Sequence, residues 1–290
     1  MDIYAIVTEK IINLLESGVV PWRRPWTSTG LPCNLVSKKP YCGVNFFLLS
    51  ASKYVSPFWL TMRQANELGG HVRKGEESTA VVFWKIEDAK RSTDDLDAEE
   101  TEKQTRRRFL LRFYRVWNLE QCELPQSVLD KLPKMETHQH DPIEAVEKII
   151  AGMSNPPEIV RGGSKAFYSP ITDRITLPPR ELFISSDEEA ATKIHEVVHS
   201  SGSRKRLARE GLCEAAPFGS PVYSFEEMVA EMGAAYLCAE AGISNAVVEN
   251  QAAYVSGWLK KCRGDRKLLI HAAAQAQRAT DYILGRNAIA

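Results

Sequence analysis

Residues 195–199 read His-Glu-Val-Val-His, a set of side chains that suits metal-assisted hydrolysis. Two histidines four residues apart lie about one turn apart on one face of a helix, so both imidazoles can reach a single tetrahedral ion. Glu196 lies beside them, where it can take a proton from water and later pass it to a leaving amine. The alternative is a chance match on a polar helix surface, because a pattern this short also occurs without a site.

A metal site needs a third ligand beyond His195 and His199. Gly202 is present but position 205 is Lys, which excludes the longer pattern that ends in a third histidine. Downstream, Glu227 and Glu231 are four residues apart on the small, apolar face of an Ala-rich helix, where carboxylates are costly to bury without a cation or hydrogen-bonding partners. We expect Glu227 to be the third ligand, with Glu226 as the alternative. We expect Glu231 to accept a hydrogen bond from a ligand imidazole.

The helix boundaries bear on this interpretation. Ser186 and Glu189 have the spacing of a capping box that begins the histidine helix, and Gly202 ends it. Ser224 and Glu227 have the same spacing, which would use Glu227 at a helix start rather than at a metal. Two histidines and one glutamate leave one coordination position open and favour zinc, with manganese or another divalent ion as the alternative.

The elements that must position these residues predict an α+β protein in two parts. We expect a mixed α/β domain over residues 1–125, a linker over 126–141, and a mainly helical domain with a small sheet over 142–290. In the first domain, strands over 79–86 and 109–117 flank a polar, acidic insertion over 87–105, so the two strands should pair antiparallel.

Shorter patterns fill in the remaining elements. Periodicity predicts helices over 3–15, 61–68 and 143–153, and a segment over 44–51 that is either helix or strand. Short strands are expected over 158–161, 165–168 and 174–177, followed by helices to the end.

Composition indicates a globular protein without a membrane span. No run of eighteen apolar residues occurs, and the first twenty residues lack the pattern of a signal peptide. The six cysteines contain no Cys-x-x-Cys pair, so we expect them to be reduced and the protein to be cytoplasmic.

The net charge is zero, but it is unevenly distributed. Residues 1–86 carry +4 and residues 106–117 carry +5, whereas residues 87–105 carry −5 and residues 118–290 carry −4. Without its acidic insertion the N-terminal part is strongly basic, which suggests a polyanion partner for that half alone. A solvated charged surface is the simpler alternative.

Aromatic and basic residues alternate in the N-terminal part. Rings on which bases can stack, next to cations that follow phosphates, suit a single-stranded nucleic acid. The alternative is that the tryptophans fold back into the core. Readout of double-stranded DNA is not expected, because no basic recognition helix or zinc-finger spacing occurs. The candidate DNA contacts are Trp22, Arg23, Arg24, Trp26, Lys38, Lys39, Tyr41, Asn45, Arg73 and Lys74.

Taken together, these motifs resemble the ArdC-type antirestriction proteins of conjugative plasmids and related mobile elements, over essentially the whole chain. The resemblance rests on segments that match the family's motifs, with departures at Cys42, where Arg is expected, and at Ser200-Ser201, where an aromatic residue and Thr often follow. The matching segments are 21–26, 41–45, 58–61, 64–65, 72–76, 166–168, 173, 177–178, 195–199, 202 and 226–231.

The resemblance implies a single-stranded-DNA-binding domain joined to a zincin-like metallopeptidase domain. Such proteins protect incoming plasmid DNA, which enters as a single strand, from host restriction. The alternatives are an active metalloprotease that acts on DNA-bound or crosslinked proteins, such as a restriction component, and a DNA-shielding protein whose metal site is structural. No membrane partner is expected.

Overall fold

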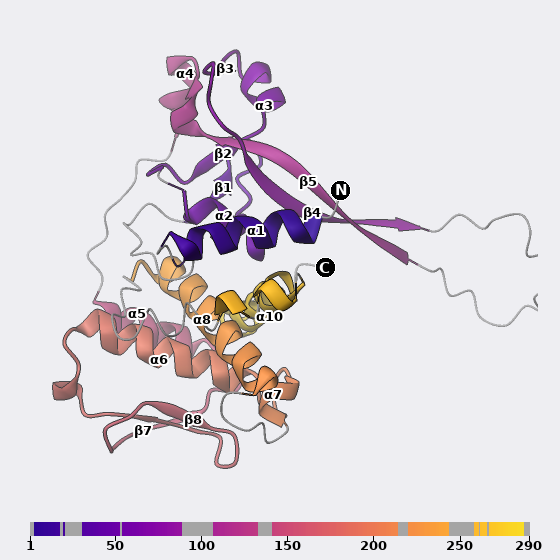
Figure 1. Ribbon diagram of the computed structural model, residues 1–290. Coiled ribbons are helices and arrows are strands. Elements are labelled where there is room, and N and C mark those ends of the chain that lie inside the picture. Colours follow the sequence, from indigo (N-terminus) through magenta and orange to yellow (C-terminus); the bar gives the residue numbers. More distant parts are fainter. Residues whose placement is uncertain are drawn as a thin grey trace, which may run out of the picture.

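The computed structural model describes residues 3–17, 20, 31–52, 54–88, 107–132, 141–213, 220–243, 258–260, 262–265 and 267–286. In Figure 1, the elements up to residue 132 lie mainly in the upper half and those from residue 141 in the lower half. The α+β class predicted from the sequence is confirmed.

A four-stranded sheet organises the N-terminal half, in the order β1-β2-β5-β4. Strands β1 and β2 are parallel, and β5 is antiparallel to both of its neighbours. A separate two-stranded sheet joins β3 to β6. The strands are β1 (Cys33–Asn34), β2 (Phe58–Leu60), β3 (His71–Val72), β4 (Thr79–Asp88), β5 (Arg107–Asn118) and β6 (Cys122–Glu123).

Strands β4 and β5 form a long ribbon that leaves the body of the protein (Figure 1). Their antiparallel pairing, predicted from the sequence, runs from Thr79↔Val116 to Asp88↔Arg107. Strand β2 pairs only with the last two residues of β5, so the rest of the ribbon is two-stranded. Of the acidic insertion, residues 87–88 belong to β4 and residues 89–105 lie outside the described residues.

The helices of this half follow the sequence patterns closely. The segment predicted to be either helix or strand is helix α2, and all seven of its residues are buried. Thr61 caps α3 in a capping box with Gln64, as its sequence position predicts. One short helix, α4, falls within the predicted linker, whose residues 133–140 lie outside the described residues. The helices are α1 (Ile3–Glu16), α2 (Val44–Ser50), α3 (Met62–Glu67), the 3-10 helix η1 (Leu119–Gln121) and α4 (Gln126–Leu129).

In the C-terminal half, helices cover a three-stranded sheet of order β7-β9-β8. The bounds of β7 (Glu158–Arg161) and β9 (Arg174–Leu177) match the prediction, and β8 (Phe167–Ser169) begins two residues later than predicted. The helices are α5 (Pro142–Ala151), η2 (Arg180–Leu182), α6 (Ser186–Ser201), α7 (Glu210–Cys213), α8 (Pro221–Ala241) and α10 (Leu268–Ile283).

The two halves share a hydrophobic core. Side chains of α1 and α2 pack in one cluster with side chains of α8 and α10, and α1 lies between the halves in Figure 1. The ring centroids of Phe46 and Tyr236 are 4.4 Å apart, and the Tyr236 hydroxyl donates to the carbonyl of Gly43. A second cluster packs α5, α6 and the small sheet against α8. None of the described helices is long and apolar enough to cross a membrane.

Candidate functional site

Helix α6 carries the His-Glu-Val-Val-His pattern, and most residues of this helix are buried. The predicted end at Gly202 is confirmed, but the predicted N-cap is wrong by one residue. Ser185, rather than Ser186, caps the helix by accepting from the backbone of Glu188, and the carboxylate of Glu188 accepts from the backbone of Ile184. Glu189 is instead buried and forms an ion pair with Arg161.

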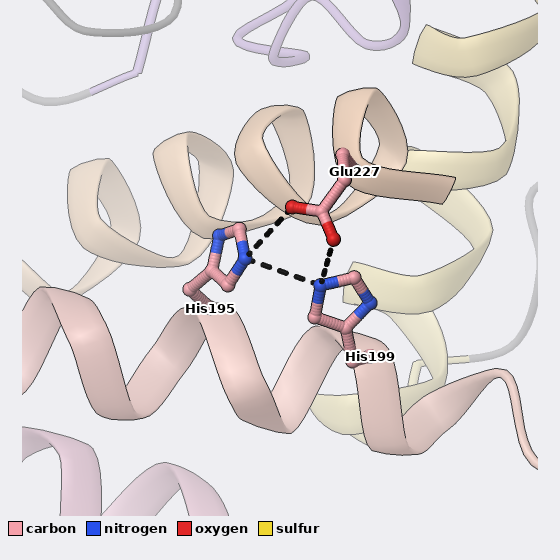
Figure 2. Close-up of side chains that lie close together, drawn as sticks. All are labelled: His195, His199 and Glu227. Atoms are coloured by element: carbon pink, nitrogen blue, oxygen red, sulfur yellow. Dashed lines mark hydrogen bonds and ion pairs between the residues drawn. The ribbon is translucent and has the colours of Figure 1, made fainter. Parts of the chain in front are cut away.

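Helix α8 supplies the carboxylates that face α6. It begins at Pro221, and Ser220 caps it. Ser224 therefore lies inside the helix, and the alternative in which Ser224 and Glu227 form a capping box is wrong. Glu227 is left free of any capping role and projects toward α6 (Figure 2).

His195, His199 and Glu227 converge on one point. Their nearest ligand atoms are separated by 3.1 Å (His195 Nε2 to His199 Nε2), 3.5 Å (His199 Nε2 to Glu227 Oε1) and 3.7 Å (His195 Nε2 to Glu227 Oε2). A tetrahedral ion with bonds of about 2.0–2.1 Å has ligand atoms about 3.3–3.4 Å apart. The donor set and its spacing therefore fit a divalent ion. Within the described part of the chain, no other group of three such residues is close enough to hold one.

A glycine lets the two helices approach closely enough for this convergence. A Cβ added to Gly233 of α8 would lie 2.7 Å from a methyl group of Val198 on α6, closer than real Cβ contacts allow. Glycine at position 233 thus removes the side chain that would separate the histidine helix from the glutamate helix.

The electrostatics of the three residues are strongly coupled. Burial alone would lower the pKa of His195, but the hydrogen bond to Glu227 and the charges of Glu196 and Glu231 raise this pKa to about 9. Burial alone would raise the pKa of Glu227, but His195 and His199 lower it to about 2. The pocket thus favours positive charge between the imidazoles and the carboxylate, which a proton or a cation can supply.

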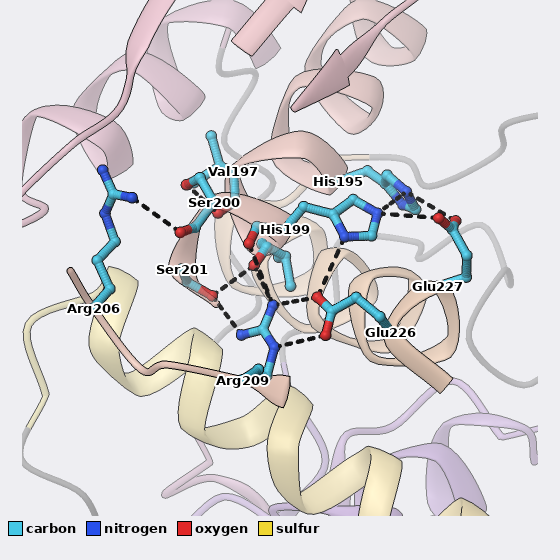
Figure 3. A network of polar contacts seen from close by, with 10 residues as sticks. His195, Val197, His199, Ser200, Ser201, Arg206, Arg209, Glu226 and Glu227 are labelled. Carbon is cyan, nitrogen blue, oxygen red and sulfur yellow. Dashed lines mark hydrogen bonds and ion pairs between the residues drawn. The ribbon is translucent and has the colours of Figure 1, made fainter. Parts of the chain in front are cut away.

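The neighbouring carboxylate, Glu226, lies behind His199. Its Oε1 is 3.3 Å from His199 Nδ1, on the opposite side of the ring from the site (Figure 3). Arg209 donates to both Glu226 oxygens at 2.9 and 2.6 Å, to Ser201 Oγ at 2.8 Å and to the carbonyl of Val198 at 2.8 Å. Glu226 therefore fixes the orientation of a predicted ligand, and its own position is fixed by Arg209.

The two remaining carboxylates of the prediction lie close to the same histidines. Glu196 is 7% exposed and lies between the two histidines in α6. Glu231, one turn after Glu227 on α8, lies close enough to contribute to the raised pKa of His195. The hydrogen bond that we expect Glu231 to accept from a ligand imidazole remains a prediction.

A second polar network holds the C-terminal end of α6. Arg206, whose side chain is fully buried, donates to Asp173 at 2.6 Å and to the carbonyl of Ser200 at 3.0 Å. Burial alone would raise the pKa of Asp173, but bonds from Arg206, Tyr168 and Lys205 lower it to about 2. Burial and the bond to Asp173 raise the pKa of Tyr168 to about 12. Tyr168 is thus engaged in anchoring the β8–β9 turn.

The candidate DNA contacts divide into three groups. Trp22, Arg23, Arg24 and Trp26 lie outside the described residues. A second group is exposed, as a contact with a polyanion requires, and consists of Lys38, Lys39, Arg73 and Lys74. The guanidinium of Arg73 donates to Glu76 and to the carbonyl of Glu120.

The last two candidates, Tyr41 and Asn45, are buried. The Asn45 amide donates to the carbonyl of Val82 and accepts from the Val82 backbone amide, both at 2.7 Å. Tyr41 packs in a small cluster with Trp59 and Val81. The structure therefore differs from the expectation of two exposed contacts: Asn45, on the first turn of α2, bonds to β4, and Tyr41, just before α2, packs against β2 and β4.

Sequence reasoning missed Arg209 and the supporting position of Glu226. The only signal was the adjacency of Glu226 to Glu227, which led us to treat Glu226 as an alternative ligand. Nothing local marks Arg209, which lies 17 residues from Glu226 along the chain.

The fold and this site define a class: a zincin-like domain joined to an ArdC N-terminal domain. Residues 1–117 match the family model for the N-terminal domain of anti-restriction factor ArdC, and residues 144–275 match the model for a zincin-like metallopeptidase. The crystal structure of antirestriction ArdC protein from plasmid R388 is 32% identical, with a TM-score of 0.74 over 98% of this chain and 97% of that chain. The chain belongs to the ArdC family of antirestriction proteins.

A second structure and two further relatives are similar to nearly the whole of this chain. An Mn(II)-bound structure of the R388 protein gives the same identity and TM-score. The uncharacterized protein y4eC of Sinorhizobium fredii is 34% identical over 97% of this chain and 91% of its own length. A DNA primase TraC of Escherichia coli is 36% identical over 97% of this chain, which spans only 20% of that protein.

Proposed function

We propose that this chain protects plasmid DNA from host restriction by binding it as a single strand through its N-terminal half, and that its C-terminal half holds a divalent metal ion. The observation that carries the metal assignment is the convergence of His195, His199 and Glu227 within 4.8 Å. The basic, aromatic N-terminal half supports the single-strand assignment. Membership of the ArdC family, and the names of its DNA-processing relatives, support the protective role.

The metal is zinc in this proposal. Two imidazoles and one carboxylate form the donor set of hydrolytic zinc sites, and they leave a position open. Manganese is the alternative, since the R388 relative has an Mn(II)-bound structure. Metal analysis of purified protein, followed by competition between Zn(II) and Mn(II) in calorimetry, separates the two. Glu227→Gln should lower the affinity for either metal, because it changes a ligand, whereas Glu226→Gln leaves the three ligands in place.

The residues around the site would give this half a peptidase chemistry. A bound divalent ion would act as a Lewis acid toward water and toward a peptide carbonyl. Glu196 would accept the proton of the attacking water and deliver it to the leaving amine. Glu226 would accept from His199 Nδ1 and keep its Nε2 turned toward the site.

The decisive experiment compares wild type with Glu196→Gln in a plasmid-transfer assay into a restricting recipient. Glu181→Gln, an exposed carboxylate on η2, is the matched control. The Glu196→Gln substitution should abolish any proteolysis, and it should leave single-strand binding and restriction protection unchanged. Loss of protection with intact DNA binding would instead favour the second candidate, a DNA-directed metalloprotease that removes bound or crosslinked proteins.

A further inference from the structure

Two exposed aromatic rings touch on the β4–β5 ribbon. Phe83 and Tyr114 are 44% and 48% exposed, their ring centroids are 5.5 Å apart, and their planes meet at 71°. Single exposed apolar side chains are ordinary on a protein surface, but adjoining aromatic rings form a patch with a defined shape. Neither ring was among the sequence candidates for DNA binding.

The strand register places both rings on one face of the ribbon. Phe83 lies opposite Arg112 and Val81 lies opposite Tyr114, and residues directly opposite each other project from the same face of an antiparallel pair. Arg112, which is exposed, therefore stands on the same face as the rings. The aromatic pair and a cation thus form one surface.

The body of the protein supports this surface from its inner end. The Tyr41 ring centroid lies 6.3 Å from that of Phe83, and Tyr41 is itself buried against Trp59 and Val81. Rings supported in this way lose little conformational freedom when a ligand stacks on them, so they are preorganised.

The charge of the β4–β5 ribbon favours a negatively charged ligand. Arg112 is exposed on the face of the two rings, Arg115 is exposed on the other face, and Lys39 is exposed in the loop just before Tyr41. The other two arginines of β5, Arg107 and Arg108, lie opposite Asp88 and Glu87 of β4. An apolar protein partner on this face would cover the exposed Arg112 and offer it no negative charge. A chain of phosphates with accessible bases satisfies both the cations and the rings.

We infer that Phe83 and Tyr114 form a stacking platform for the bases of a single-stranded nucleic acid whose phosphates pass Arg112. Bases in a duplex are stacked on one another and do not present their faces to side chains, so the platform favours single strands. This inference rests on the proposed single-strand binding and assigns it to the β4–β5 ribbon.

The test uses the full chain and a fluorescent oligo-dT, with affinity measured by anisotropy at several salt concentrations. The double substitution Phe83→Ala and Tyr114→Ala should raise Kd about tenfold or more. It should leave the slope of log Kd against log salt unchanged, because it removes no phosphate contact. Arg112→Gln should reduce that slope by about 0.7, the contribution of one phosphate contact on a single strand.

Matched variants separate stacking from folding. Phe83→Trp with Tyr114→Phe keeps both rings and should retain wild-type affinity, whereas Ile184→Ala removes an 82% exposed apolar side chain from the other half and should have no effect. Circular dichroism melts report whether the alanine variant is folded. If it is not, the double substitution Phe83→Leu and Tyr114→Leu, which keeps apolar side chains in the strands but removes both rings, takes its place and should also raise Kd, and the salt slope of Arg112→Gln tests the phosphate contact.

Two results would overturn the platform. One is a folded alanine variant with a Kd within twofold of wild type. The other is a concentration-dependent dimer, seen by sedimentation, that the alanine variant loses with no change in DNA affinity. Absence of oligo-dT binding by wild type would instead remove the proposed single-strand function and the platform together.

Discussion

Arg209 and Glu226 allow the stability of the site to be separated from its affinity for metal. Both side chains are 5% exposed, and they are joined by two hydrogen bonds of 2.9 and 2.6 Å. Arg209→Met removes the cation and leaves the Glu226 carboxylate buried against His199 alone. Breaking a buried pair from one side costs about 3–5 kcal/mol, most of it from the charge that remains.

Removing Glu226 instead of Arg209 leaves a different set of contacts. Glu226→Met strands Arg209, but this guanidinium keeps its bonds to Ser201 Oγ and to the carbonyl of Val198. We expect a smaller loss of stability, about 2–3 kcal/mol. The double variant contains neither charge, so its cost should fall short of the sum of the single costs by at least about 2 kcal/mol.

Metal affinity should follow a different order, because Glu226 contacts the imidazole of His199, whereas Arg209 contacts only the backbone carbonyl of that residue. Glu226→Met and the double variant should bind Zn(II) about 10- to 100-fold more weakly, since a partner that orients a ligand imidazole is lost. Arg209→Met keeps the carboxylate but removes the group that holds it in place, so it should weaken Zn(II) binding less than Glu226→Met does. Stability and metal affinity would thus rank the three variants differently.

The measurements are urea unfolding in EDTA, followed by circular dichroism, and competition for Zn(II) with a chromogenic chelator. Glu181→Gln, which removes an exposed carboxylate on η2 just before α6, is the control for charge removal. Additive stability costs in the double variant would refute the buried-pair reasoning. A Zn(II) affinity of Glu226→Met within twofold of wild type would refute the orienting role.

Three further predictions concern the rest of the fold. Asp173→Asn should destabilise the protein by about 2 kcal/mol at neutral pH. In thermal melts at different pH values, the difference in stability from wild type should be complete above about pH 4 and should fade as the pH falls through about 2. The reason is that the pKa of Asp173 in the native protein is lowered to about 2. Asn45→Ala should cost about 2–3 kcal/mol in urea unfolding without changing the DNA affinity of the folded protein, because both amide bonds go to Val82. A fragment of residues 142–290 should bind a hydrophobic dye and fail to melt cooperatively, because the face around Tyr236 loses its cover.

Local spacing explains how much of the site the sequence could predict. The i, i+4 relation of His195 and His199 needs only a helix, and the cost of burying carboxylates on an apolar face points to Glu227. The cap of α6 was misassigned because Ser185-Ser186 and Glu188-Glu189 offer two equivalent registers. The choice between them depends on the ion pair of Glu189 with Arg161, a contact over 28 residues that no local pattern encodes.

In the N-terminal half, too, the sequence did not predict which side chains point into the core and which point to solvent. Tyr41 and Asn45 have the right residue types for a DNA contact, but the turn into α2 buries both. Phe83 and Tyr114 lie in apolar strand patterns typical of a core, yet they are exposed, on the part of the ribbon that does not pair with β2. Residue type indicates which side chains suit a nucleic acid, but tertiary packing decides which of them reach solvent.

Helix α8 connects the two halves through opposite faces. Met232 and Tyr236 lie in the core shared with α1 and α2, whereas Ala234 and Cys238 lie in the core shared with α6. The first turns of the same helix present Glu226 and Glu227 to the histidines. A rearrangement of α8 would therefore affect both the core shared with the N-terminal half and the carboxylate that we assign to the metal. The predicted boundary near residue 125 divides the chain in sequence, but the N-terminal and C-terminal halves are packed as one unit around this helix.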